Sequence, residues 1–166
     1  NWQELKSFAT ALKDQGGAQW GINLQPGGTG SWQTFLPFVW QAGGDVVDAN
    51  GQWTLDSEQM TQALDYYKSF FTEKLSPGSL QPGELESMFV DGEIGAFVSG
   101  PWHIGILKEQ GGAGFEQKFD VAMMPTEQAG TSFVGGSDLA VFKDSGNRDA
   151  AWKFVAYVSS PEAQDT

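Results

Sequence analysis

The sequence predicts an α/β fold for this chain of 166 residues. Short apolar runs of strand length alternate with longer stretches in which apolar side chains recur at helical spacing. Clusters of glycine and proline separate most of these stretches, and no internal repeat is present. Helices and strands that alternate along a chain are the pattern of α/β folds. With 40% hydrophobic residues, the chain has the composition of a globular protein.

Helical spacing of apolar side chains predicts helices in residues 2–12, 31–40, 56–71, 84–90, 101–110 and 147–158. We expect Ser31, Asp56 and Asn147 to cap three of these helices, since their side chains accept hydrogen bonds from free backbone N–H groups. In the fifth helix, Gly100 is expected at the N-cap and Pro101 at the first helical position. Pro37 is expected to interrupt or kink the second helix.

Four apolar runs of strand length predict strands at residues 18–24, 94–98, 119–125 and 139–142. Asn50-Gly51 predicts the turn of a small hairpin within residues 45–54. A flexible loop is expected at Gln25-Pro-Gly-Gly-Thr-Gly30.

The composition excludes several functional classes. The formal net charge of −12 opposes binding to nucleic acid or to an anionic membrane surface, which needs basic side chains. The absence of cysteine and the single histidine exclude thiol catalysis, cysteine-rich zinc sites and iron–sulfur clusters. We therefore expect no cofactor and no metal. No apolar run approaches the roughly 18 residues of a membrane span, and no signal peptide opens the sequence.

The two ends of the sequence lead us to expect a piece of a longer protein. Residue 1 opens directly into an amphipathic helix and is not methionine. The chain stops at Ser160-Pro-Glu-Ala-Gln-Asp-Thr166, which has the composition of the first turn of another helix.

Trp102 lies in the most informative stretch, residues 91–103, where a turn, a buried strand and a helix start follow one another. Junctions between strand and helix are common ligand sites in α/β folds. An indole can cover the C–H face of a sugar, while free backbone N–H groups meet its hydroxyls. Trp32, with Ser31 and Gln33 beside it, stands at another loop-to-helix entry. The other indoles are expected mainly in the core: Trp2, Trp20, Trp40, Trp53 and Trp152.

A second candidate site is Gly135-Gly-Ser-Asp138, which precedes a predicted strand. Gly135 and Gly136 would let the backbone approach a ligand closely, while Ser137 and Asp138 offer groups that hydrogen-bond sugar hydroxyls. A plain turn entering the strand is the alternative interpretation.

Two other functional classes stay open on the residues alone. A glycoside hydrolase would need two carboxylates across a cleft, and Glu84, Glu86, Asp91 and Glu93 instead indicate solvated faces and turns. A structural domain would bury all of its indoles. His103 has no recognisable catalytic partner and is expected as a surface or capping residue.

Several segments, taken in order, resemble one family. They are residues 2–6, 37–44, 88–102, 124–125, 135–142, 150–154 and 160–162. Together they are similar to the middle and later parts of extracellular solute-binding proteins of carbohydrate ABC transporters, the group that includes maltose- and trehalose-binding proteins. The resemblance spans nearly the whole chain.

The resemblance implies a truncated clamshell of the periplasmic-binding-protein-like II type, which closes on a mono- or oligosaccharide without catalysis and delivers it to a membrane ABC permease. Trp102 would stack on a sugar ring. Residues Ser31, Trp32 and Gln33 would lie in the cleft, and Gly135, Gly136, Ser137 and Asp138 would come from the crossover between the lobes.

The resemblance also implies how the chain divides and where it works. Residues 1–131 would form most of the C-terminal lobe, and residues 132–166 would be the crossover strand and helix of the other lobe. The complete protein would be extracellular or periplasmic, anchored as a lipoprotein. Exposed apolar surface on the last helix would favour self-association of the truncated chain.

Overall fold

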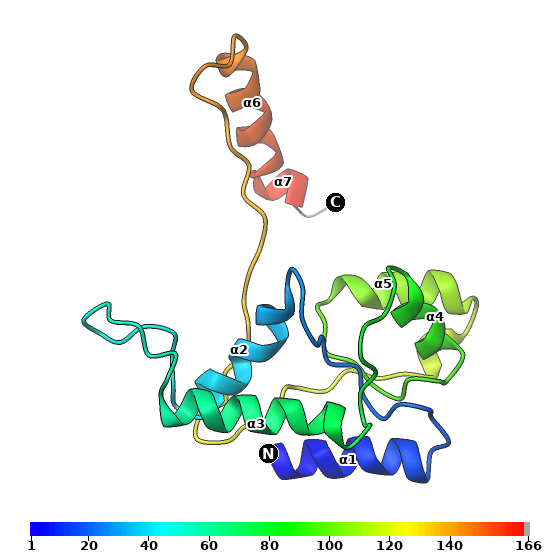
Figure 1. Ribbon diagram of the computed structural model, residues 1–166. Helices are drawn as coiled ribbons and strands as arrows, with labels where there is room; N and C mark the ends of the chain where they lie inside the picture. The colour runs from blue at the N-terminus through cyan, green and yellow to red at the C-terminus, as the bar shows by residue number, and fades with distance from the viewer. Residues whose placement is uncertain (165–166) are drawn as a thin grey trace. The chain divides into compact units, whose positions relative to one another are not determined.

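The computed structural model describes residues 1–164, and its chain divides into two units, Asn1–Phe133 and Val134–Thr166 (Figure 1). The helices of the first unit are α1 (Trp2–Asp14), α2 (Ser31–Gln41), α3 (Glu58–Thr72), α4 (Glu84–Val90), α5 (Trp102–Gly111) and the short 3-10 helix η1 (Phe115–Gln117). The second unit holds α6 (Arg148–Val158) and α7 (Pro161–Gln164). All six predicted helices are confirmed, and α7 confirms the helical turn expected after Ser160; residues 165–166 lie outside the described residues.

Three of the predicted helix caps are wrong by one residue. Ser31 is the first helical residue, because Gly30, with φ of 93°, takes the N-cap, and the Ser31 hydroxyl donates to the Gly28 carbonyl. The Ser57 hydroxyl, one residue after Asp56, accepts from the Met60 N–H at 3.2 Å. Pro101 takes the N-cap position of α5.

Two further helix predictions have mixed outcomes. Asn147 occupies the N-cap of α6, as predicted, but its side chain makes no capping hydrogen bond. Pro37 lies buried inside α2, which runs through it from Ser31 to Gln41 without interruption.

The predicted strands appear in the described residues only as isolated parallel bridges, Trp20 with Ile94 and Asn23 with Phe97. The register is the same in both bridges, but the ladder breaks between them. The cause is Ile22, whose N–H turns to the opposite side and donates to the Leu75 carbonyl at 3.1 Å. Segments 119–125 and 139–142 were predicted as strands and have no regular secondary structure, since no backbone group of either range pairs with a neighbouring strand in the described part of the chain.

The hairpin within residues 45–54 is confirmed as an antiparallel turn with a bridge between Val47 and Trp53. Gly51 has a φ of 77°, which glycine adopts without strain. The Asp48 carboxylate accepts from the N–H groups of Gln52 and Asn50, at 2.8 Å each, and these bonds lower its pKa. Trp53 is 71% exposed, so its predicted place in the core is wrong.

The core of the first unit lies where α1, α2 and α3 meet. Figure 1 shows α1 and α3 side by side, and Trp2 of α1 stacks on Tyr66 of α3 with ring centroids 4.4 Å apart. Phe38 of α2 packs edge-on against Trp2 at 5.9 Å. The core position predicted for Trp2 is therefore confirmed. Extended residues 18–24 contribute Ile22 and Leu24, both buried, to the same core.

Gln41 is a fully buried polar side chain at the centre of this core. Its Oε1 accepts from the Trp2 indole N–H at 2.7 Å, and its Nε2 donates to the Thr131 carbonyl at 2.9 Å. Its backbone carbonyl accepts from the N–H groups of Gln128 and Ala129. One residue thus ties α1 and α2 to the segment that leads out of the first unit.

In the second unit, α6 buries none of its side chains. Trp152, Phe154 and Tyr157 are each more than half exposed, so the core position predicted for Trp152 is wrong. A unit of this length is too short to enclose a core by itself. Among the described residues, no helix combines the length and the apolar character needed to cross a membrane.

We predict that Gln41→Leu destabilises the chain by about 2–3 kcal/mol, because it leaves the Trp2 indole N–H and the Thr131 carbonyl without their partner. Urea denaturation followed by circular dichroism measures the free energy of unfolding. Gln52→Leu, at an exposed position of the hairpin, is the matched control. Equal midpoints for the two variants would contradict the role given to Gln41.

We also predict that Gly21→Ala destabilises the chain by about 3 kcal/mol through overpacking. A Cβ at Gly21 would lie 1.8 Å from the Ala9 carbonyl oxygen, so α1 would have to move. Gly27→Ala is the control, because its Cβ would meet nothing within 4 Å. The thermal midpoints of the two variants are compared with that of the original chain, and a Gly21→Ala midpoint as high as that of Gly27→Ala would show that α1 tolerates the extra methyl group.

Candidate functional site

Trp102, the main candidate from the sequence, lies at the start of α5 with its indole 63% exposed. The ring lies over Gly100: a Cβ at that glycine would be only 2.0 Å from Cζ3 of the indole. Gly100 is therefore needed to leave room for the ring. The result is a flat aromatic surface, open to solvent, at the junction between an extended segment and a helix.

Backbone donors without a partner lie next to Trp102 in the sequence. The N–H groups of Ser99, Gly100 and Trp102 donate no hydrogen bond to any of the described residues. Free N–H groups at a helix start are available to a ligand. Donors beside an exposed ring face are the arrangement expected for a ligand with hydroxyl groups and an apolar face.

His103 is held on both sides, which the sequence did not indicate. Its Nδ1 is hydrogen-bonded to the Ser99 hydroxyl, and its Nε2 lies 3.0 Å from Glu86 Oε1 of α4. The side chains of His103 and Glu86 are only 14% and 17% exposed. The predictions of a surface histidine and of a solvated Glu86 are therefore wrong. The cause is a contact over 17 positions, which no local pattern reveals.

The electrostatics of this link favour a charged Glu86. Burial of the carboxyl would raise its pKa, but its own backbone N–H and the His103 ring outweigh burial and lower the pKa. Glu86 Oε2 is buried and has no hydrogen-bond partner in the described part of the chain. The link joins α4 to the first turn of α5 and so restrains the helix that carries Trp102.

Trp32, the second candidate indole, lies at the start of α2 and is 48% exposed. It packs edge-on against Phe133, with ring centroids 5.0 Å apart. Ser31 donates to the Gly28 carbonyl, and Gln33 is exposed. The structure therefore brings Ser31, Trp32 and Gln33 together beside the glycine loop, but no ring contact between Trp32 and Trp102 occurs in the described residues.

Gly135, Gly136, Ser137 and Asp138 lie in the second unit. All four are exposed and have no regular secondary structure. A Cβ at Gly136 would meet nothing within 4 Å. These residues keep the open backbone that the sequence predicted, without the strand expected after them.

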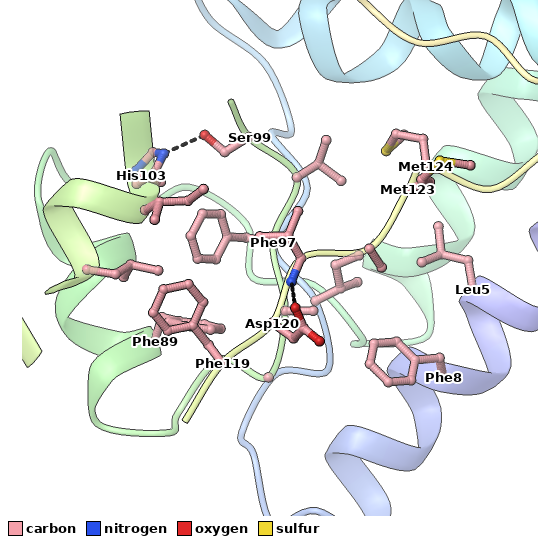
Figure 2. Close-up of a pocket in the computed structure, with 18 of the residues that line it drawn as sticks. Leu5, Phe8, Phe89, Phe97, Ser99, His103, Phe119, Asp120, Met123 and Met124 are labelled. Atoms are coloured by element: carbon pink, nitrogen blue, oxygen red, sulfur yellow. Dashed lines mark hydrogen bonds between the residues drawn. The ribbon is translucent and has the colours of Figure 1, made fainter. Parts of the chain in front are cut away.

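A cavity of about 510 Å³ lies next to the Trp102 junction within the first unit. Figure 2 shows Ser99 and His103 at one side of it and Leu5 and Phe8 of α1 at the other. Its lining is mainly apolar and does not include Trp102. Among the described residues, no group of three or more histidine, cysteine or acidic side chains could hold a metal ion.

Comparisons with known proteins agree with this fold. The chain matches the model of the bacterial extracellular solute-binding protein family over residues 1–165. It is 27% identical to the maltotriose-binding protein of Pyrococcus abyssi over 176 residues, a match that covers 97% of this chain and 35% of that protein.

Two solved structures share the fold. The GacH receptor of Streptomyces glaucescens, solved unliganded and with acarbose, superposes with a TM-score of 0.82 at 30% identity over 99% of this chain and 42% of the receptor. A solute-binding protein of an ABC transporter from Thermotoga lettingae, solved with α-D-tagatose, gives a TM-score of 0.86 at 21% identity over 99% of this chain and 43% of that protein.

The chain spans less than half the length of the relatives and structures that it matches. The match nevertheless extends over nearly all of its own residues, and the structures that share its fold are solute-binding proteins, which confirms the α/β, periplasmic-binding-protein-like fold and the resemblance found in the sequence. The chain belongs to the bacterial extracellular solute-binding protein family.

Proposed function

We propose that this chain is part of a sugar receptor, which binds a mono- or oligosaccharide without catalysis and delivers it to an ABC import permease. The observation that carries this proposal is the exposed Trp102 indole beside three unpaired backbone N–H groups. The apolar face of a pyranose covers the ring, while its hydroxyls accept from the amides.

The names of the relatives support a sugar as the ligand. The Pyrococcus abyssi protein is named for maltotriose, and the GacH receptor was solved with acarbose. Both compounds have several sugar-like rings in a row. A row of rings would suit a site in which Trp102 and Trp32 each cover one ring, with Ser31 and Gln33 contributing polar contacts.

The division at Phe133 and Val134 supports a two-lobed receptor. In this proposal residues 1–131 are most of the C-terminal lobe, and residues 132–166 are the crossover strand and helix that belong to the N-terminal lobe. Gly135, Gly136, Ser137 and Asp138 then belong to the crossover, where hinge closure would bring their backbone and polar groups to the sugar.

The family is extracellular, and we propose that the complete gene product is held at the membrane as a lipoprotein beside its permease. We propose no nucleic-acid partner, because the net charge of −12 opposes binding to a phosphate backbone. The exposed Trp152, Phe154 and Tyr157 of α6 would make the chain self-associate when the rest of its lobe is absent.

We predict that Trp102→Ala weakens sugar binding by the complete gene product at least about tenfold, equivalent to about 1.4 kcal/mol. Calorimetric titration with maltotriose and acarbose measures the dissociation constants. Trp53→Ala removes another exposed indole, on the hairpin, and is the matched control. Binding that Trp102→Ala leaves unchanged would remove this indole from the site, and no binding of either sugar or of monosaccharides would count against the proposal itself.

We predict that Gly100→Ala weakens the same binding to a similar degree, although it removes no contact group. The added methyl would occupy the space of the indole, so the ring must turn away. Gly105→Ala, in the same helix, adds a methyl that meets nothing within 4 Å and is expected to bind normally. Equal affinities for the two variants would mean that the orientation of the ring does not matter.

We predict no turnover of chromogenic glycosides by the gene product. The best-defined buried carboxylate, Glu86, bonds to His103. A glycosidase would require two carboxylates that face each other across a cleft. Release of chromophore at a rate that Glu86→Gln abolishes would instead support the glycoside hydrolase alternative.

A further inference from the structure

The link between Glu86, His103 and Ser99 ends at a hydroxyl group. Glu86 Oε1 lies 3.0 Å from Nε2 of His103, and Nδ1 of the same ring is bonded to the Ser99 hydroxyl, a bond that Figure 2 shows. The side chains of Glu86 and His103 are mostly buried, whereas Ser99 is exposed. The link thus connects a buried carboxylate to a hydroxyl that a ligand can reach.

The direction of each hydrogen bond in this link follows from the groups involved. Burial opposes ionisation of Glu86, but its backbone N–H and the His103 ring outweigh burial and lower its pKa, so the carboxylate is charged and can only accept. These partners assign the ring hydrogen of neutral His103 to Nε2, and Nδ1 then accepts from the Ser99 hydroxyl. The Ser99 oxygen keeps its lone pairs free to accept from a ligand, because it has no further partner in the described residues.

The backbone at the start of α5 supplies hydrogen-bond donors. The N–H groups of Ser99, Gly100 and Trp102 have no partner in the described residues, whereas the Gly100 carbonyl already accepts from the His103 N–H at 3.2 Å. A sugar hydroxyl has lone pairs that accept and one hydrogen that it donates. Backbone N–H groups can bond to its oxygen, but its hydrogen needs an acceptor, and leaving that hydrogen unpaired weakens binding.

Ser99 lies near the indole of Trp102 and is held there. The His103 ring, to which Ser99 is bonded, has its centroid 6.0 Å from that of the indole. The indole itself lies over Gly100, the residue that follows Ser99. His103 is restrained in turn, since it packs edge-on against Phe97 with centroids 5.0 Å apart and bonds to Glu86. The Ser99 hydroxyl is therefore oriented by a ring that is itself fixed on two sides.

We infer that Ser99 determines specificity in the sugar site: its oxygen accepts a hydrogen bond from a hydroxyl of the sugar ring that stacks on Trp102. His103 and Glu86 are positioning residues, because they act through Ser99 and fix its hydroxyl as an acceptor. This inference rests on the proposed function and adds a polar contact to it. The site then discriminates a sugar from the deoxy analogue that lacks this hydroxyl, since the analogue leaves the Ser99 oxygen without its partner.

Nitrogen-15 NMR of the His103 side chain in the complete gene product tests the positioning without any sugar. The neutral ring is expected to carry its hydrogen on Nε2, and Ser99→Ala is expected to shift the Nδ1 resonance toward that of an unbonded nitrogen. The His103 signals are identified by their loss in His103→Gln. A neutral ring with its hydrogen on Nδ1, or an Nδ1 resonance that Ser99→Ala leaves in place, would overturn the inference.

Calorimetric titration of the complete gene product with maltotriose tests the contact itself. Ser99→Ala is expected to weaken binding about fivefold, the loss of one hydrogen bond. Ser99→Thr keeps the hydroxyl and is expected to restore most of the affinity. Ser79→Ala, at another exposed serine, is the matched control and is expected to bind like the original protein.

Monodeoxy analogues of maltotriose then separate a direct contact from a structural role. The analogue that lacks the contacted hydroxyl is expected to bind equally to the original protein and to Ser99→Ala, whereas the other analogues lose about fivefold in the variant. An equal loss for every analogue, or no loss for maltotriose, would overturn this inference and leave the proposed function standing. No binding of any sugar by the original protein would overturn both.

Discussion

The buried carboxamide of Gln41 is the interaction on which most of the first unit depends. It bonds to residues near both ends of that unit, Trp2 and Thr131, through its two side-chain atoms. A buried amide can satisfy these partners only in one position, so it fixes where α1 and the exit segment lie relative to α2. Trp2 passes this constraint to α3, because it stacks on Tyr66, whose hydroxyl donates to the Trp2 carbonyl.

The helices could be predicted from the sequence because their signals are local. Apolar spacing and glycine terminators placed all six helices, and the errors at their caps are single-residue shifts caused by competition between neighbouring residues such as Gly30 and Ser31. Strands were harder, because a strand exists only through its partner. Residues 119–125 have the composition of a strand, yet none of their backbone groups pairs with another strand in the described residues.

The candidate site shows the same difference between local and distant information. The exposed position of Trp102 follows from the local Gly-Pro-Trp sequence and was predicted. The Ser99–His103–Glu86 link was not, because Glu86 and His103 meet only when α4 packs on α5. Trp53 and Trp152 were misplaced because apolar spacing shows that a face is apolar, but not that anything covers it. The lobes to which the two units belong, and the sugar contacts, remain predictions.

Gly100 has a consequence for how the family varies. Its backbone is outside the left-handed region that requires glycine, so another residue could adopt this conformation. The three nearest atoms that a Cβ would meet there all belong to the indole of Trp102. Positions 100 and 102 therefore constrain each other: a relative with a small side chain at 102 is free to carry a larger residue at 100. Among homologues, these two positions are expected to change together, as a correlated pair.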